Sequence, residues 1–529
     1  MSPDVLVVGA GPTGLTLALE AHDHGARVRI VERRPDAFRP SRALIVHPRT
    51  LEVLRPLGVT GAVLERADTA PTVLLRLGPR SVETALADFD LPGTAFPHLS
   101  LVRQADVEAV LTRALGDRGV RVERDTELLG ARDEGDGAKA VLRTPGGVEE
   151  VRCRYLAGCD GPASTVRSAA GFGWRGRPYR VEVVLADLDL TSASGRSLVS
   201  GAQVFPAREG LVLLFPLGEQ AAWRLLATRR SAGGTAEDFG QPGDAVARDE
   251  LQELLTDAGT RTRIENLAWS ARVPLRCGLA RRFRIGRLFL AGDAAHNYSP
   301  ATGQGMNAGV QDAVNLGWKL ALASQRAGGD SPTRTDGDPL LDSYEQERRP
   351  AAHHRLLLTH AAFWAEASPG RIPSWLRGAA APYAAPVVPA LLRRRRLVAE
   401  AVRVVSQLRV TYRRSPLSVQ GTPVLRGAPR PGDRVPDAAV DVAGSPGRLH
   451  ELLAHPGAHL LLQRDTAAPP PAPTGSYVSV LRLASSPGRG MVVVRPDGHV
   501  GFQCGGADAA GLIRWLRLAG FDPSAPDRE

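Results

Sequence analysis

The chain has 529 residues, of which 43% are hydrophobic and 23% charged, and its formal net charge is +10. This length predicts about three domains, since one domain usually holds roughly 100–200 residues. Arginine supplies almost all of the positive charge, because Lys139 and Lys319 are the only lysines, and acidic residues are mixed among the arginines. The mixture favours an ordinary solvated surface over a nucleic-acid-binding one, although the net charge would help to attract an anionic coenzyme. No uninterrupted apolar run reaches the roughly 18 residues of a membrane span.

The cysteines give no sign of a disulfide framework. Cys153, Cys159, Cys277 and Cys504 form no C-x-x-C pair and are too few to staple a chain of this length. The N-terminal segment lacks the basic region and the long apolar run of a signal peptide. We therefore expect a cytoplasmic protein, and no metal-binding constellation is recognisable.

The N-terminal residues have the pattern of a β-α-β unit. An apolar run at residues 4–8 predicts a strand, the turn GAGPTG follows, and a helix at residues 15–24 leads to a strand at residues 26–32. Further helices are expected at residues 48–54 and 105–119, and EGDG and TPGG indicate hairpin turns.

The pattern changes between residues 175 and 270, where β-rich blocks predict an inserted antiparallel sheet. RLFLAGDAAH then returns to the strand-and-turn pattern of the N-terminus, which indicates that the first domain is discontinuous. One arginine-rich helix is expected around Arg393 to Arg396, and a Pro/Gly-rich stretch leads into a last unit of strands closed by a helix. The expected α/β organisation is a Rossmann-like domain at residues 1–174 and 271–365, a sheet domain at 175–270, a helical and irregular connection at 366–425, and a C-terminal domain at 426–529.

GAGPTG is a G-x-G-x-x-G motif that follows a strand, opens a helix and is answered by Glu32 at the end of the next strand. Gly9 makes the turn, Gly11 admits a pyrophosphate to the backbone amides, and Gly14 brings the helix against the strand. Glu32 can bind the ribose hydroxyls of an adenosine. This pattern predicts an adenine dinucleotide, but it does not by itself distinguish FAD from NAD(P).

A second glycine-rich stretch, GDAAHNYSPATGQGMNAGVQDAVNLGWKLA, makes that distinction. Met306, Val310, Ala313, Gly317 and Leu320 lie at helical spacing, so a helix is expected to begin near Gly305 or Met306. Its N-terminal amides carry about half a positive charge, which suits the edge of a flavin that becomes anionic on reduction. The two distant motifs together favour FAD, which is long enough to reach both.

The ordered motifs GAGPTG, RALIVHPRTLEVLRPLG, LAGCDGPASTVR, GDAAHNYSPATGQG and LLDSYEQERRP resemble those of the single-component FAD-dependent aromatic hydroxylases of the p-hydroxybenzoate hydroxylase type. Within that family the chain is most similar to the hydroxylases that tailor aromatic polyketides. The resemblance covers almost the whole chain and implies a thioredoxin-like C-terminal domain. Cys504 is the only cysteine of that domain, so we expect no thiol-disulfide exchange there.

The resemblance also implies roles for individual residues. Asp160 and Gly161, with Ser164 and Arg167, match a motif associated with FAD and the nicotinamide coenzyme, although on local grounds CDGPAST is also a turn followed by a helix cap. The residues expected to bind FAD or the coenzyme are Gly9, Gly11, Pro12, Thr13, Gly14, Glu32, Arg33, Arg42, Arg103, Gln104, Asp160, Gly161, Arg167, Gly292, Asp293, Pro300, Gly303, Gly305, Met306 and Asn307.

The implied reaction uses tight, non-covalent FAD, transient NADPH or NADH, and O2. A flavin C4a-hydroperoxide would hydroxylate a polycyclic phenol, and most of the chemistry would belong to the cofactor. Pro300 is expected beside the flavin ring, and His47, His296 and Tyr298 are candidates to assist phenol deprotonation. A structural role for each of these three side chains remains the alternative.

Three other functions compete with hydroxylation. The same flavin chemistry could perform a Baeyer–Villiger or epoxidising reaction, and the chain could be a flavin-containing binding or sensor protein without turnover. A nucleic-acid-binding protein is the third and predicts a steep salt dependence of DNA affinity. We expect the partners to be a small aromatic substrate and O2, with the protein a monomer or homodimer.

Overall fold

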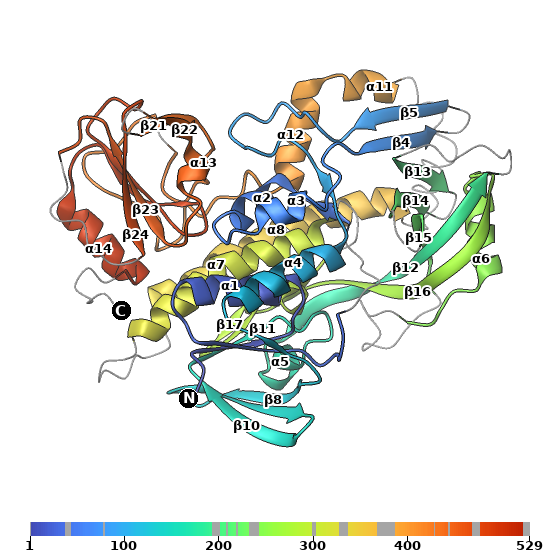
Figure 1. The fold of residues 1–529 in the computed structure, drawn as a ribbon, viewed down its shortest axis with the longest axis horizontal. Coiled ribbons are helices and arrows are strands. Elements are labelled where there is room, and N and C mark those ends of the chain that lie inside the picture. The colour runs from blue at the N-terminus through green and yellow to red at the C-terminus, as the bar shows by residue number, and fades with distance from the viewer. Residues whose placement is uncertain are drawn as a thin grey trace.

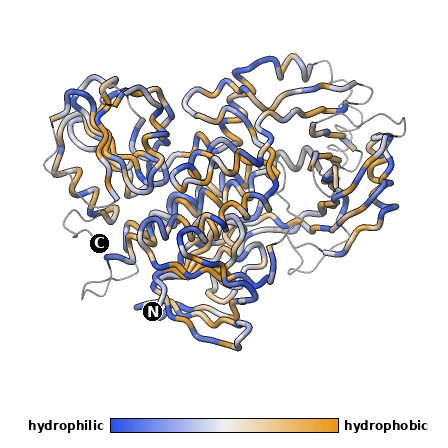
Figure 2. The backbone as a smooth tube through the Cα atoms, viewed as in Figure 1, coloured by the Kyte–Doolittle hydropathy of each residue, from blue (hydrophilic) through white to orange (hydrophobic). Residues whose placement is uncertain are grey.

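The computed structural model describes residues 2–37, 44–77, 80–192, 201–207, 210–217, 221–231, 243–298, 303–326, 337–367, 387–427, 429–442, 445–467 and 477–521. It is a mixed α/β molecule (Figure 1) in which three large sheets follow one another along the long axis. Apolar residues concentrate along the strands and central helices (Figure 2), where they form the core. In the described part of the chain, no helix is both long and apolar enough to cross a membrane.

The first sheet lies at the centre and has six strands in the order β17-β18-β11-β1-β2-β7. All its pairs are parallel except β17 with β18, and its central strands β1, β11 and β18 are fully buried and mainly apolar, as expected for a sheet covered on both faces. Helices α1, α4 and α7 pack beside it and place the cofactor motifs at the carboxyl ends of the strands. Its elements are β1 (Val5–Val8), α1 (Pro12–Asp23), β2 (Val28–Val31), α4 (Gln104–Asp117), β7 (Val122–Glu123), β11 (Tyr155–Gly158), β17 (Arg284–Ile285), β18 (Leu288–Leu290) and α7 (Gln304–Arg326).

Smaller elements surround this sheet. The predicted helix at residues 48–54 is confirmed as α2 (Pro48–Leu54), and both predicted hairpin turns join the strands of a three-stranded sheet. These smaller elements are β3 (Ile45–Val46), α3 (Thr60–Leu64), β6 (Ser100–Leu101), β8 (Glu127–Asp133), β9 (Ala138–Thr144), β10 (Gly147–Cys153), α5 (Thr165–Ala169) and η1 (Gly292–Ala294).

The second sheet has eight strands in the order β19-β16-β12-β15-β14-β13-β4-β5 and lies at one end of the molecule. It reaches beyond the predicted range of 175–270, because β4, β5 and β19 come from segments assigned to the first domain. Alternation along β14 gives the sheet two faces: Val212 and Leu214 pack with helix α6, and Leu213 lies on the other face. The elements are β4 (Thr72–Leu77), β5 (Arg80–Ala85), β12 (Trp174–Ser192), β13 (Ala202–Ala207), β14 (Gly210–Pro216), β15 (Trp223–Arg230), α6 (Arg248–Asp257), β16 (Thr262–Ala280) and β19 (His296–Asn297).

The third sheet has seven strands in the order β20-β26-β25-β23-β24-β21-β22 and lies at the opposite end. Phe521 stacks on Trp318 of α7 at 6.1 Å, so the C-terminal unit packs directly against the central helices. The predicted closing helix is confirmed as α14. The elements are β20 (Val419–Gln420), β21 (Ala439–Val442), β22 (Ser445–Arg448), α13 (Leu449–Leu452), β23 (Ala458–Gln463), β24 (Val478–Leu483), β25 (Met491–Val494), β26 (Val500–Cys504) and α14 (Ala509–Ala519).

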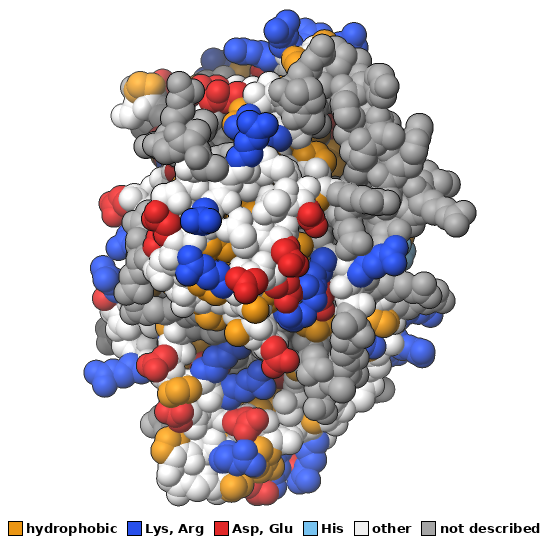
Figure 3. Space-filling model, turned by 90° about the vertical axis from the view of Figure 1, so that its right-hand side faces the viewer, with side chains coloured by type: hydrophobic (Ala, Val, Ile, Leu, Met, Phe, Trp, Pro, Cys, Tyr) orange, Lys and Arg blue, Asp and Glu red, His pale blue; other side chains and the backbone are white. Residues whose placement is uncertain are grey.

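Long helix α8 (Pro339–Ala367) runs beside α7 and leads toward the connection between the sheets. The prediction of a single helix around Arg393 to Arg396 is wrong, because α11 (Val387–Leu392) ends before α12 (Arg395–Val405) begins. Arg393 and Arg394 lie between the two helices, and Arg395 and Arg396 begin α12, so the four arginines do not share one helix face. Figure 3 likewise shows basic and acidic side chains interspersed on the face at the end of the large sheet.

Candidate active site

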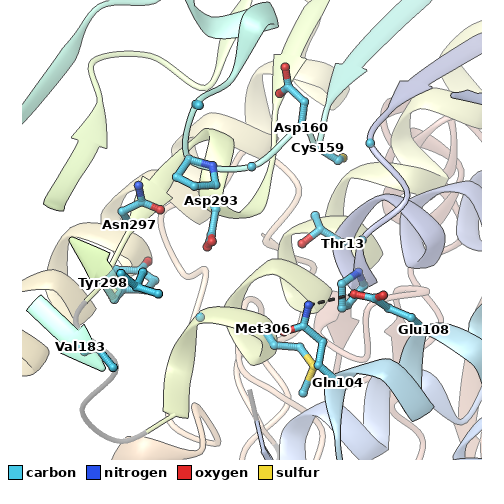
Figure 4. A pocket seen from close by; sticks show the side chains of 18 of the residues that line it. Thr13, Gln104, Glu108, Cys159, Asp160, Val183, Asp293, Asn297, Tyr298 and Met306 are labelled. Atoms are coloured by element: carbon cyan, nitrogen blue, oxygen red, sulfur yellow. Dashed lines mark hydrogen bonds between the residues drawn. The ribbon is translucent and has the colours of Figure 1, made fainter. Parts of the chain in front are cut away.

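A cavity of about 560 Å³ runs from the central sheet to the face of the eight-stranded sheet. One part is a groove beside α1, α4 and α7, and the other is a chamber against β12, β13, β14, β15 and β16. Figure 4 shows the groove side chains of Thr13, Gln104 and Glu108 across the cavity from Asn297 and Tyr298. The arrangement gives one continuous space for a long cofactor and a second molecule.

The turn from β1 to α1 forms the first wall of the groove. Gly9 has a φ of +101°, and an added Cβ would lie 2.4 Å from the carbonyl oxygen of Cys159, so this position requires glycine. An added Cβ at Gly11 would meet nothing within 4 Å, which leaves the backbone at the start of α1 open to a ligand. Glu32 accepts hydrogen bonds from the backbone nitrogens of Ala10 at 2.9 Å and Arg34 at 3.1 Å. This wall fits the adenosine and pyrophosphate of a dinucleotide.

The second wall comes from η1 and the N-terminus of α7. The Asp293 carboxylate lies beside that N-terminus, because an added Cβ at Gly305 would be 3.9 Å from Asp293 Oδ1. Asn307 holds the start of α7 against the chain near β3: its Nδ2 donates to the Ile45 carbonyl at 2.8 Å, and its Oδ1 accepts from the His47 backbone nitrogen at 2.9 Å. Gly305 and Met306 line the cavity, so the start of α7, with backbone amides that lack a partner within the helix, borders it as a partly positive surface.

Helix α4 supplies a third wall, which contains a residue that the sequence analysis missed. Glu108 lines the groove one helical turn after Gln104, and Gln104 Nε2 donates to Glu108 Oε1 at 2.8 Å (Figure 4). Burial raises the pKa of the Glu108 carboxyl to about 7, and the hydrogen bond from Gln104 opposes that rise. The i, i+4 spacing from Gln104 was a usable signal for this pair, but the burial of Glu108 was not readable from the sequence.

The segment with Asp160 and Gly161 approaches the groove from β11. Asp160 Oδ2 accepts from the Val166 backbone nitrogen at 3.1 Å, and the structure confirms Ser164 as the cap of α5. Arg167 lies behind the groove, where it donates to the carbonyl oxygen of Ala294 at 2.9 Å and stacks on Trp174 at 4.5 Å. The guanidinium thereby ties this segment to η1.

The chamber is walled mainly by aliphatic side chains. Leu211, Leu213 and Phe215 project from β14 into it, and the neighbouring strands add further apolar residues. These further apolar residues are Val183, Leu185, Val204, Leu226, Val273 and Leu275. An apolar chamber of this kind suits a small molecule with a mainly apolar body and few polar groups.

Two of the three candidate bases, His296 and Tyr298, contact other side chains of the protein. His296 is fully buried, and its Nε2 lies 2.5 Å from Asp312 Oδ2. Burial alone would raise the pKa of Asp312, but the charges of His296 and Arg348 hold it below its usual range. The Tyr298 ring stacks on His296 at 4.8 Å, its hydroxyl is shut off from solvent, and burial raises its pKa well above the ordinary value. His47 is buried outside the cavity lining.

The predicted site residues thus divide into three groups. Gly14, Arg103, Arg167, Gly292, Asn307, His47 and His296 lie behind the lining, and Arg42 and Pro300 fall outside the described residues. The predicted residues that line the cavity are Gly9, Gly11, Pro12, Thr13, Glu32, Arg33, Gln104, Asp160, Gly161, Asp293, Tyr298, Gly303, Gly305 and Met306. The described residues contain no cluster of three or more potential metal ligands.

Comparison with known protein families agrees with an FAD-binding site. Residues 2–357 match the family model described as FAD binding domain, and residues 428–519 match the one described as aromatic-ring hydroxylase, C-terminal. The chain is 34% identical over 473 residues to 6-methylpretetramide 4-monooxygenase of Streptomyces rimosus, covering 88% of this chain and 80% of that protein.

Solved structures with a similar fold match this chain over nearly its whole length. The anhydrotetracycline hydroxylase of Streptomyces rimosus is 28% identical, with a TM-score of 0.74, covering 99% of this chain and 100% of that one. Aklavinone-11 hydroxylase, solved with FAD and aklavinone, is 26% identical with a TM-score of 0.73, covering 98% of each chain.

Proposed function

The chain belongs to the family of FAD-dependent aromatic hydroxylases, and we propose that it inserts one oxygen atom of O2 into a polycyclic phenol of the aromatic polyketide type. The observation that carries this proposal is one continuous cavity, in which a dinucleotide groove opens into an aliphatic chamber. Its relatives act on 6-methylpretetramide, anhydrotetracycline and aklavinone, which supports a flat, fused-ring substrate.

The groove residues have distinct tasks in this proposal. Gly9 and Gly11 present backbone to the pyrophosphate of FAD, and Glu32 binds the adenosine ribose. Asp293 holds the ribityl end, while the amides at Gly305 and Met306 stabilise negative charge on the flavin ring. Bound FAD supplies oxygen activation after reduction by NADPH or NADH, and the protein excludes water and orients the substrate.

The same proposal assigns a role to each structural unit of the molecule. Residues 1–174 and 271–365 form the cofactor domain, apart from the parts of them that join the eight-stranded sheet, which carries the substrate chamber. The unit that begins near residue 426 is thioredoxin-like. Cys504 is buried and is the only cysteine of that unit, which supports a structural or oligomer-contact role over thiol-disulfide exchange. Lys319, Glu347 and Arg495 form a fully buried ion cluster at its contact with α7 and α8, which supports a fixed attachment.

Two measurements test the function. Anaerobic mixing of the holoprotein with NADPH, in a stopped-flow spectrometer, should bleach the flavin absorbance, and polycyclic phenols should accelerate the bleaching. Aerobic incubation with the same phenols should yield products heavier by one oxygen atom with the ring system intact. If the flavin stays oxidised with every phenol, the proposal that the chain is an enzyme is wrong. A lactone product would indicate a Baeyer–Villiger reaction instead of hydroxylation, and an epoxide product would indicate epoxidation.

A further inference from the structure

Few polar side chains line the chamber, and they differ in whether another part of the protein already contacts them. Thr228 Oγ1 is engaged, because it accepts a hydrogen bond from the Leu211 backbone nitrogen at 2.9 Å. Arg276 lies 5.9 Å from the Trp174 ring, and the Tyr298 hydroxyl is shut off from solvent. Asn297 remains: it lines the cavity, is 8% exposed, and its amide has no hydrogen-bond partner among the described residues.

The geometry of β19 explains why Asn297 faces the chamber. Its backbone pairs with Gly278 of β16, and the preceding residue, His296, pairs with Leu279. Successive side chains of a strand point to opposite sides. His296 binds Asp312 and is not part of the cavity lining, so Asn297, the next residue of β19, points toward the cavity. Figure 4 shows its amide extending toward the open space beside Asp293.

A ligand that fills the chamber removes water from the Asn297 amide and has to replace the hydrogen bonds made by that water. Burying such a group without a hydrogen bond costs roughly 1–3 kcal/mol. Asn297 offers both a donor and an acceptor, so it can meet either a hydroxyl or a carbonyl oxygen. A site built to hydrogen-bond one substituent also rejects molecules that lack it.

We propose that Asn297 is the residue that orients the substrate, by binding a hydroxyl or carbonyl oxygen on the ring nearest the cofactor groove. The inference rests on the proposed function and narrows its substrate class to fused aromatics that carry such an oxygen at one edge. Since Asn297 follows Asp293 along the same short segment, an oxygen held there fixes which ring edge faces the flavin end of the groove.

The test uses the oxidised holoprotein and two ligands, phenanthrol and phenanthrene, which differ by one hydroxyl group. Binding is followed by the change in flavin absorbance and requires no turnover. The wild-type protein should bind phenanthrol about three- to tenfold more tightly than phenanthrene, as expected for one neutral hydrogen bond. Asn297→Leu should abolish this preference, whereas Asn297→Ser should restore part of it.

The matched control is Asn266→Leu, which makes the same change at an exposed position of β16 outside the cavity and should keep the wild-type preference. Asn297→Ala repeats the measurement with a smaller side chain, and retained FAD absorbance serves as the folding check. A wild-type protein without the preference, or an Asn297→Leu variant that keeps it, overturns the inference. Either result leaves the proposed function standing if NADPH still bleaches the flavin and product still forms.

Discussion

The cofactor groove and the substrate chamber adjoin each other but are built by different means. In the groove, glycines and helix ends expose the backbone, and buried charges such as Asp312 hold the turns in place. In the chamber, one face of a sheet presents mainly aliphatic side chains, and a few polar residues, Asn297 among them, interrupt the apolar surface. The groove thus depends on backbone geometry that tolerates few changes, whereas the chamber depends on side chains that can vary between relatives.

The largest effect is expected behind the groove, at Asp312. Its carboxylate binds His296, Arg348 and the backbone nitrogen of Gly292, at 2.5, 2.7 and 3.0 Å. Asp312→Asn leaves the Arg348 cation buried without its anionic partner, which should lower the free energy of unfolding by about 3–5 kcal/mol. Urea denaturation of the apoprotein measures this loss, and FAD retention should fall with it because Gly292 loses its anchor.

Asp433→Asn is the matched control, since Asp433 pairs with Arg413, whose side chain is 52% exposed. An exposed pair contributes about 0–1 kcal/mol. Equal losses at Asp312 and Asp433 would contradict the view that buried charges hold the groove.

Two neighbouring leucines of β14 lie on opposite faces of the eight-stranded sheet, so their substitution allows the two faces to be compared. Leu214 is fully buried in the core with α6, so Leu214→Ala should destabilise the protein by about 2–5 kcal/mol and leave ligand binding largely unchanged. Leu213 lines the chamber, so Leu213→Ala should cost less stability but weaken phenanthrol binding by about tenfold. Thermal unfolding and flavin-absorbance titration separate the two, and a Leu213→Ala variant as unstable as Leu214→Ala would argue against an open chamber.

The groove could be predicted from the sequence because its determinants are local. Gly9, Gly11 and Glu32 occur at the spacing that a strand, a turn and a helix dictate, so the motif predicts their arrangement without knowledge of distant contacts. The glycine-rich stretch after Asp293 was informative for the same reason, and α7 begins at Gln304, next to the expected position.

The chamber was less predictable because its geometry comes from long-range pairing. His296 and Tyr298 were predicted as candidate bases because they lie in a flavin-facing motif, whereas the pairing of β19 with β16 turns His296 toward Asp312 of α7 and leaves Asn297 facing the cavity. The same applies to Glu108, whose helix was predicted but whose burial depends on the residues packed around it. No local pattern records which face of a two-residue strand meets a cavity.

A substitution at Gly11, where the groove is open, should have a smaller effect that is confined to cofactor binding. An added Cβ at Gly11 would meet no protein atom within 4 Å, so Gly11→Ala should leave the folded apoprotein intact. The methyl group would stand where the pyrophosphate approaches the backbone, and such crowding, at about 1–3 kcal/mol, should raise the FAD dissociation constant by about tenfold or more. Fluorescence titration of apoprotein with FAD measures it. Gly116→Ala, in open space on α4, is the control and should bind FAD as the wild type does.

The smallest effect is a pH dependence from Glu108. Its pKa is raised from 4.5 to about 7 in the folded protein, so the folded state keeps a proton that the unfolded state releases between these values. The free energy of unfolding should therefore fall as pH rises from about 4.5 to 7, and Glu108→Gln should remove this part of the slope. Above pH 7 the ionised carboxylate would also repel the pyrophosphate, so wild-type FAD affinity should weaken by about fivefold or less, the effect of one screened charge pair. FAD titrations at pH values on both sides of 7 measure this, and an equal pH dependence in Glu108→Gln would assign the proton to another group.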